Sequence, residues 1–229
     1  PGSGGGRVPS ETAELAANDL TLLLEARRYE RVDRESPTLG ATPSEQAIVL
    51  FEGSESSLRE QWADGATMTP AGELLAGATT RRTFQDFRLH LEFLVPSMPE
   101  YRGQARGNSG VYCQGRYQIQ ILDSFGFGEA EANRCGAIYG LQEPAVNVSL
   151  PPLRWQTLDV EFTAARWSGN GIKTSDARLN VWLNGVPIHR EVPLRGTTAG
   201  APLKEGPDPG PIVLENHGNV VRFRNVWIQ

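Results

Sequence analysis

Polar and apolar side chains alternate in several short segments, and the polar positions are the first candidates for chemistry. In the run Tyr117–Ile121, Gln118 and Gln120 alternate with Ile119 and Ile121. Side chains two positions apart lie on one face of a β-strand, so we expect the two amides to share a face. Glutamine donates and accepts hydrogen bonds but takes no proton. The pattern therefore predicts a strand with one polar face, which carries the two amides, and one apolar face.

Histidine is the natural candidate for proton transfer, because only its side chain has an ordinary pKa near neutrality. The chain has three histidines. His217, in the segment Glu215-Asn216-His217-Gly218, is the best single candidate for a catalytic residue. The alternative is that His217 braces the turn before Val221.

The second histidine, His90, belongs to a predicted strand over residues 84–93, where apolar and polar residues alternate without interruption. Arg88, His90 and Glu92 share its polar face. We expect a solvated face of alternating charge, with contact to a bound ligand as the second possibility. His189 follows a predicted hairpin and is expected at the surface.

Two further residues are candidates for binding. Arg116 could hold a carboxylate or carbonyl of a ligand, or form an ordinary ion pair with Asp123. Asn108 is predicted to lie in a loop, where binding residues tend to collect.

Two cysteines, Cys113 and Cys135, are the only ones in the chain. In an exported protein such a pair is typical of one disulfide, which would stabilise the fold by roughly 3 kcal/mol. Two separate thiols are the alternative. Neither cysteine has a histidine or a second cysteine at ligand spacing, so we expect no metal site there and no cofactor. A Ca²⁺ ion held by loop carboxylates stays open.

The elements that must position these residues are predicted to be β-strands. Alternation recurs in residues 158–162 and 179–183, and Asn184-Gly185 then predicts a hairpin, because both central residues of a type I′ turn need positive φ. The high content of glycine (25) and proline (16) suits short strands joined by tight turns. Many short strands with one apolar face predict an all-β sandwich of two antiparallel sheets.

Residues 1–46 differ in character and are predicted to be an N-terminal tail, followed by one sandwich domain over residues 47–229. After a Gly-rich spacer, residues 10–17 and 18–29 are predicted to be short helices, and prolines then enforce an extended stretch. Helices this short do not stand alone in water. We therefore expect the tail to pack on the sandwich or on a partner.

Composition narrows the partners and the location. The net charge is −5 without a basic stripe, which argues against nucleic acid. No apolar run approaches the roughly 18 residues that cross a bilayer. The chain opens with Pro1 and a Gly/Ser run. This start is typical of a mature protein whose export signal has been removed, or of a short segment left by cloning. We expect an exported, periplasmic or outer-surface protein, associated with the membrane through a lipid anchor or a partner.

Three blocks of sequence resemble one known family. They begin at Asn108, Cys135 and His217 and include NSGVY with GRYQIQILDS, CGAIYG with PAVN, and HGN with VRFRNVWI. Together with LFEG at residues 50–53, they are similar to the 3-keto-disaccharide hydrolase family over about four-fifths of the chain. The resemblance implies a jelly-roll sandwich of the concanavalin A-like type. It also implies that the strand face with Gln118 and Gln120 lines a concave cleft that binds sugar.

Members of this family are linked to the cleavage of glycosides first oxidised at C3. A 3-keto group acidifies the neighbouring C–H, so the reaction needs a base, an acid and a group that polarises the carbonyl. On this hypothesis His217 shuttles the proton. The expected saccharide-binding residues are Asn108, Arg116, Gln118, Gln120, Arg88, His90 and Glu92. The tryptophans Trp155, Trp167, Trp182 and Trp227 could include a platform for a sugar ring, although core or edge packing is the stronger expectation.

Two departures from the family pattern weaken a catalytic role. The family usually has glutamate at the position of Gln118. The family also has the sequence Gln-Asp-His-Gly more often than the Glu215-Asn216-His217-Gly218 of this chain. The carboxylate is therefore one residue earlier in this chain, which places it on the other face of the strand. These changes favour a non-catalytic binding or structural subunit, docked through residues 1–46 to a membrane protein complex. A plain carbohydrate-binding module is a third possibility.

Overall fold

A computed structural model describes residues 21–24, 27–30, 34–128 and 131–229, which fall into two units, Pro1–Arg34 and Glu35–Gln229. The described part of the first unit is a hairpin of β1 (Thr21–Leu24) and β2 (Arg27–Glu30), paired antiparallel. The prediction of a helix over 18–29 is therefore wrong. A helix of this length makes few hydrogen bonds for the residues it orders, whereas two strands pair their backbones with each other. The predicted helix over 10–17 lies outside the described residues.

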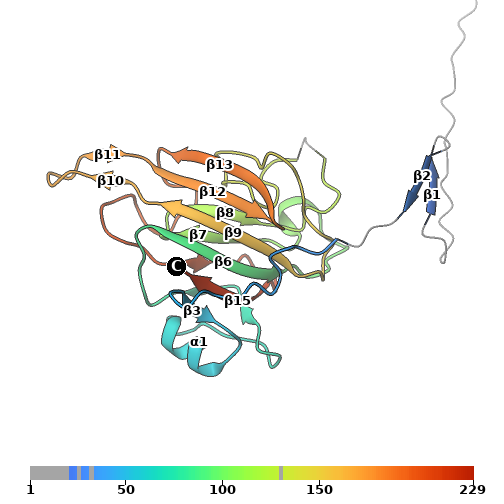
Figure 1. The fold of residues 1–229 in the computed structure, drawn as a ribbon, viewed down its shortest axis with the longest axis horizontal. Coiled ribbons are helices and arrows are strands. Elements are labelled where there is room, and N and C mark those ends of the chain that lie inside the picture. The colour runs from blue at the N-terminus through green and yellow to red at the C-terminus, as the bar shows by residue number, and fades with distance from the viewer. Residues whose placement is uncertain (1–20, 25–26, 31–33, 129–130) are drawn as a thin grey trace, which may run out of the picture. The chain divides into compact units, whose positions relative to one another are not determined.

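Within the second unit, the larger sheet is antiparallel and has seven strands (Figure 1). Its order begins at one edge with three long strands, β13 (Val186–Leu194), β12 (Ala177–Leu183) and β9 (Gln156–Thr163). It continues through β6 (Phe87–Leu94), β15 (Arg222–Ile228) and β3 (Ile48–Phe51), and β4 (Leu74–Leu75) also pairs with β15.

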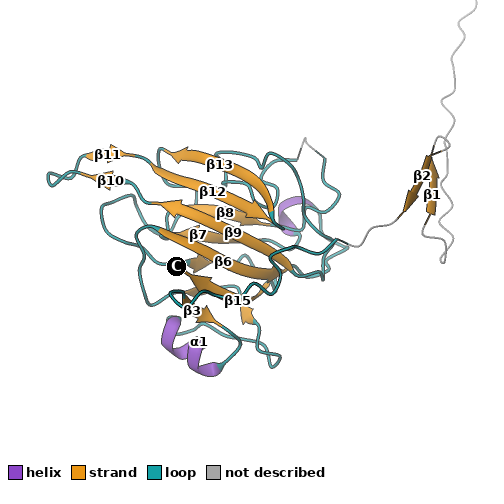
Figure 2. Cartoon of the chain, viewed as in Figure 1, coloured by secondary structure: helices purple, strands orange, loops and turns teal. Residues whose placement is uncertain are grey.

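The smaller sheet has four antiparallel strands in the order β5 (Ala78–Thr79), β14 (Val213–Leu214), β7 (Ser109–Cys113) and β8 (Tyr117–Ile121). Helix contributes little in the described residues (Figure 2). The remaining elements are α1 (Glu55–Gln61), the 3-10 turn η1 (Gly103–Ala105), and a hairpin of β10 (Arg166–Trp167) and β11 (Lys173–Ser175).

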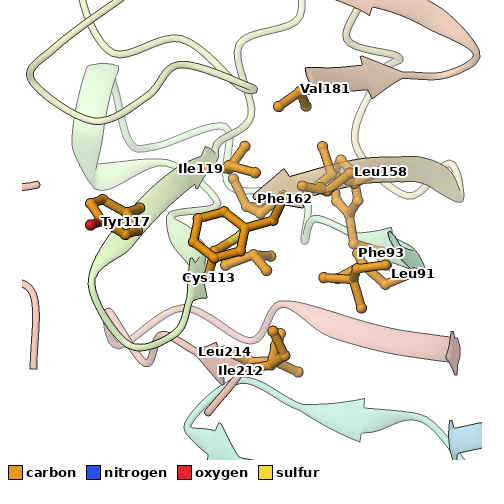
Figure 3. Close-up of a cluster of buried hydrophobic side chains, with 14 of the residues drawn as sticks. Leu91, Phe93, Cys113, Tyr117, Ile119, Leu158, Phe162, Val181, Ile212 and Leu214 are labelled. Atoms are coloured by element: carbon orange, nitrogen blue, oxygen red, sulfur yellow. The ribbon is translucent and has the colours of Figure 1, made fainter. Parts of the chain in front are cut away.

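The hydrophobic core lies between the two sheets (Figure 3). Alternate residues of each strand face it, such as Leu91 and Phe93 of β6 and Leu158 of β9, while Ile119 of β8 and Leu214 of β14 face it from the other sheet. The prediction of an all-β, two-sheet antiparallel sandwich is confirmed.

The turn between β12 and β13 also follows the prediction. Asn184 has φ 52° and Gly185 has φ 73°, so both central residues are left-handed. This conformation matches the right-handed twist of the flanking strands.

Residues 35–46, which the sequence places in the tail, pack against the outer face of the larger sheet. The Ser36 hydroxyl lies 2.6 Å from the Thr157 hydroxyl, and the Gly40 N–H donates to Glu92 at 2.6 Å. The compact unit therefore begins at Glu35. Among the described helices, none is long and apolar enough to cross a membrane.

The expected disulfide is not formed, because Cys113 and Cys135 are free, buried thiols. Burial raises the pKa of both thiols, that of Cys135 to about 11, so both stay protonated at neutral pH. Both side chains belong to the core cluster, where a free cysteine behaves as a small hydrophobic residue. A sequence spacing does not fix whether two Cα atoms come within bridging distance.

Candidate functional site

A pocket of about 280 Å³ lies over the smaller sheet. We call it the glutamine pocket. Its lining residues come from β7 and β8, from the residue that precedes β7, and from the segments that follow β8, β13 and β14: Asn108, Tyr112, Gln118, Gln120, Tyr139, Ala199, Gly200, Glu215 and His217. Four of the residues predicted from sequence therefore meet here, namely Asn108, Gln118, Gln120 and His217.

Strand alternation in β8 turns the two glutamines into this pocket. Ile119 and Ile121 are fully buried in the core, so Gln118 and Gln120 project from the opposite face. The Gln120 amide donates to the Gln104 side-chain oxygen at 2.9 Å and to Asn108 Oδ1 at 3.3 Å. Asn108 is fixed in turn by its own amide, which donates to the Gln104 carbonyl at 2.6 Å. The pocket wall is thus a connected network of amides.

Glu215 places a carboxylate in the same pocket. Leu214 is buried in the core, so the next side chain along the chain points outward. The Gln118 amide donates to Glu215 Oε2 at 2.7 Å. The residue is also anchored by its backbone, since its N–H donates to the Gly110 carbonyl at 2.8 Å. The carboxylate that the sequence places one residue earlier than the family pattern therefore lies in the pocket.

Gly110 lets Gln118 reach Glu215. The strand order β14-β7-β8 puts Gly110 of β7 between the two residues. A Cβ atom at Gly110 would overlap the side-chain nitrogen of Gln118. The amide thus lies directly over the glycine backbone, a close approach that only a residue without a side chain permits.

Tyr112 is the second partner of Glu215. Burial raises the pKa of the Tyr112 phenol, and the charge of Glu215 and its hydrogen bond with the phenol raise it further. Tyr112 therefore remains a protonated hydrogen-bond donor at any physiological pH. A carboxylate that receives hydrogen bonds from a phenol and an amide is held in one orientation inside the pocket.

His217 lies at the pocket's exposed rim. It follows Glu215 by two residues in an irregular segment that begins where β14 ends. A carboxylate inside and an imidazole at the mouth give the pocket two groups that can take or deliver a proton.

Arg116 does not line the pocket, and its guanidinium binds backbone carbonyls. Its guanidinium donates to the Lys204 carbonyl at 2.8 Å and to the Asp208 carbonyl at 2.9 Å. The loop that it fixes is continuous with Ala199 and Gly200, which line the pocket. Arg116 therefore has a supporting position behind the wall. The ion pair that the sequence suggested for Asp123 is made by Arg106, at 3.0 Å.

Arg88, His90 and Glu92 lie on the outer face of the other sheet, away from the glutamine pocket. Arg88 is exposed and pairs with Glu161 at 3.0 Å. The side chains of His90 and Glu92 are each only 1% exposed. The expectation of a solvated face is thus wrong for these two, because residues 35–46 cover them.

Buried hydrogen bonds hold both covered residues. His90 Nδ1 lies 2.6 Å from Asp159 Oδ1, and Arg224 donates to Glu92 at 2.7 Å. Burial by itself would raise the pKa of Glu92, but hydrogen bonds from Asn225, Arg224 and the Gly40 N–H outweigh it and lower the pKa.

His189 is also buried, contrary to the surface position that the sequence suggested. Its Nε2 lies 2.8 Å from the Gly136 carbonyl oxygen, and burial lowers its pKa. Among the residues that the structure describes, no group of three or more His, Cys, Asp or Glu side chains could hold a metal ion.

Sequence reasoning named Glu215 but missed its place in the site, and it did not name Tyr112 or Tyr139. The available signal for Tyr112 was its alternation with Val111 in the NSGVY block, which puts it on the face opposite the core. Glu215 carried no such signal, because the two-residue strand β14 is too short to show a period.

Comparison with known proteins places residues 46–229 within the model of one family, described as a 3-keto-alpha-glucoside-1,2-lyase-like domain. A candidate glycosyl hydrolase of Parabacteroides distasonis ATCC 8503 is similar in structure, with 29% identity, a TM-score of 0.71, and coverage of 81% of this chain and 84% of that chain. Two further candidate glycosyl hydrolases of the same organism share the fold. The first has 21% identity and a TM-score of 0.53, and the match covers 80% of this chain and 98% of that chain. The second has 17% identity and a TM-score of 0.55, and the match covers 82% of this chain and 97% of that chain. No curated protein sequence matches the chain.

Proposed function

The chain belongs to the family of 3-keto-alpha-glucoside-1,2-lyase-like domains, and from this premise we propose that the glutamine pocket eliminates the C1 substituent from a 3-keto-glycoside. One observation carries the proposal: the carboxylate of Glu215 lies in the pocket between the Gln118 amide and the Tyr112 phenol, with His217 at the rim. The cavity, at about 280 Å³, suits one sugar ring with its aglycone outside.

The proposed chemistry starts at C2. The ketone at C3 acidifies the C2–H bond, and Glu215 takes that proton as the general base. The electron pair of the C–H bond forms a C1–C2 double bond, and the bond from C1 to the leaving oxygen breaks. His217, in its protonated form, delivers a proton to that oxygen. The products are an alcohol and an unsaturated ketosugar, and addition of water across the double bond would make the net reaction a hydrolysis.

A pocket amide stabilises charge on the carbonyl oxygen. Negative charge develops at O3 as the C2 proton leaves, and donors already fixed in position stabilise it without reorganisation. The Asn108 amide, which lines the pocket, gives one N–H to the Gln104 carbonyl and has a second N–H that can donate to O3.

A kinetic assay with methyl 3-keto-α-D-glucopyranoside tests the proposal. We expect Glu215→Gln to lower kcat by roughly 10²- to 10⁴-fold, because the amide takes no proton. His217→Ala should lower it less for a good leaving group such as 4-nitrophenol, which departs without protonation. Asn216→Ala, at an exposed neighbour outside the pocket, is the control. A wild-type rate in Glu215→Gln would refute the assignment of the base.

The alternative is a non-catalytic subunit docked through residues 1–46, for which the amide at position 118 is the supporting observation. Isolation from native membranes under mild detergent separates the two proposals. Co-purification with integral membrane proteins in fixed stoichiometry, together with no turnover of the ketoglucoside, would favour the docked subunit. Export and membrane association are part of this alternative and are tested by the same fractionation.

A further inference from the structure

A second pocket, of about 210 Å³, lies on the outer face of the larger sheet. It shares no residue with the glutamine pocket. We call it the tryptophan pocket, after two of its eight lining residues, Arg88, Leu89, Asp159, Val160, Glu161, Trp182, Trp227 and Gln229.

Strand register explains why two tryptophans face the same pocket. Trp182 of β12 pairs with Asp159 of β9, Asp159 pairs with His90 of β6, and His90 pairs with Trp227 of β15. Residues directly opposite each other on neighbouring strands project to the same face. The four side chains therefore form one row, with the tryptophans at its ends, three strand spacings or roughly 14 Å apart.

The inner side chains of the row hold Trp227 in place. The His90 ring stacks on the Trp227 indole with centroids 5.0 Å apart and planes at 21°. His90 is in turn fixed by Asp159, at 2.6 Å. Both indoles are half-buried, so each keeps part of its surface exposed. A ligand would meet at least one aromatic side chain, Trp227, that needs little further ordering, which favours binding.

The charges at the pocket are already paired. Arg88 bonds Glu161 at 3.0 Å, and Asp159 accepts from the Thr38 hydroxyl at 2.8 Å as well as contacting His90. A charged ligand would have to displace one of these partners. A neutral ligand rich in hydroxyl groups can use the unoccupied lone pairs and N–H groups while its apolar C–H faces cover the indoles.

We propose that the tryptophan pocket binds a neutral pyranose unit of an oligosaccharide. The sugar ring lies over the Trp182 indole, and its hydroxyls bond Asp159, Arg88 and Glu161. Because the two pockets lie on the outer faces of different sheets, this binding does not depend on chemistry in the glutamine pocket. It would hold a glycan chain to the protein independently of turnover.

Titration with three neutral hexasaccharides, maltohexaose, cellohexaose and laminarihexaose, tests the proposal by calorimetry and tryptophan fluorescence. We expect at least one of them to bind. Trp182→Ala should weaken that binding by about tenfold, because the sugar loses an apolar surface that it buries. Trp182 is only half-buried, so this variant should keep its fold, which its melting temperature checks.

Trp155→Ala is the matched control, because Trp155 is a half-buried tryptophan stacked with Arg224 outside the tryptophan pocket. The Trp155→Ala variant should bind the sugar with the affinity of the wild type, and the Glu215→Gln variant should do the same. Trigalacturonic acid, an anionic sugar, should not bind at this pocket. Absence of binding to all three hexasaccharides would overturn the proposal, as would equal affinities of Trp182→Ala and Trp155→Ala. Loss of binding in Glu215→Gln alone would assign the sugar to the glutamine pocket and also overturn it.

Discussion

The side chains of Gln118 and Glu215 meet across Gly110, although 97 residues separate them in the chain. The resemblance noted in the sequence implies a glutamate at position 118 and a glutamine at position 215. This chain exchanges the two residue types, so one amide still faces one carboxylate. In the folded chain the Gln118 amide donates to the Glu215 carboxylate at 2.7 Å.

This exchange refines the kinetic test of the base. A carboxylate at position 118 can replace the one at position 215 as the base if either position brings it to the substrate. In that case the double variant Gln118→Glu with Glu215→Gln should recover part of the activity that Glu215→Gln loses. A double variant as inactive as the single one would mean that the proton is taken only from the side of β14.

Gly110 gives a second prediction at the residue scale. Gly110→Ala places a Cβ where the Gln118 amide lies, so we expect a loss of stability of about 1–3 kcal/mol and a fall in activity approaching that of Glu215→Gln. Thermal melting and the ketoglucoside assay measure the two effects. Gly169→Ala is the control, because no atom lies within 4 Å of a Cβ at that glycine. Equal stability of the two variants would contradict the close contact.

At the scale of elements, the segment 35–46 acts as part of the sandwich. It covers the polar row of β6, and without it Glu92 would lose the Gly40 N–H and Asn225 would lose the Ala41 carbonyl. In the intact fold these hydrogen bonds offset the desolvation of the covered Glu92 carboxylate. The segment therefore permits charged residues on a sheet face that is closed to solvent.

Two truncations test this role. Deleting residues 1–34 should leave the melting temperature of the sandwich unchanged, whereas deleting residues 1–46 should lower its stability by about 3 kcal/mol or more. Because the folded-state pKa of Glu92 is lowered, its ionised form stabilises the fold fully above about pH 4.5, and this contribution is lost as the pH falls further. The difference between the truncations should therefore shrink in acid. Equal melting temperatures at pH 7 would show that the segment contributes nothing.

At the scale of the whole molecule, the fold relies on one core between two sheets without a covalent link between Cys113 and Cys135. Both thiols contribute packing, and their raised pKa values suppress the reactive thiolate.

Thiol reactivity therefore reports on global unfolding. We expect neither cysteine to react with a disulfide reagent such as DTNB at pH 8 in the folded protein, and both to react in guanidinium chloride. A reducing agent should leave the melting temperature unchanged. A fall in melting temperature of several degrees on reduction would instead indicate that the sequence-based prediction of a disulfide holds in solution.

The sequence by itself determined the features that depend on local periodicity. Ile119 and Ile121 alternate with Gln118 and Gln120 whatever the strand pairs with, so the strand and its two faces were predictable. The Asn184-Gly185 hairpin was predictable for the same reason, because its φ angles are a property of two adjacent residues.

Only the tertiary structure decided which faces are covered and which residues meet. His90 looks solvated by its pattern but is buried under a segment some fifty residues earlier in the chain, and Arg88 beside it stays exposed. Glu215 enters the pocket because β14 lies next to β7, a pairing between strands about a hundred residues apart. Alternation fixes the side of a strand on which a residue lies, but the contents of that side depend on long-range pairing, which no local pattern encodes.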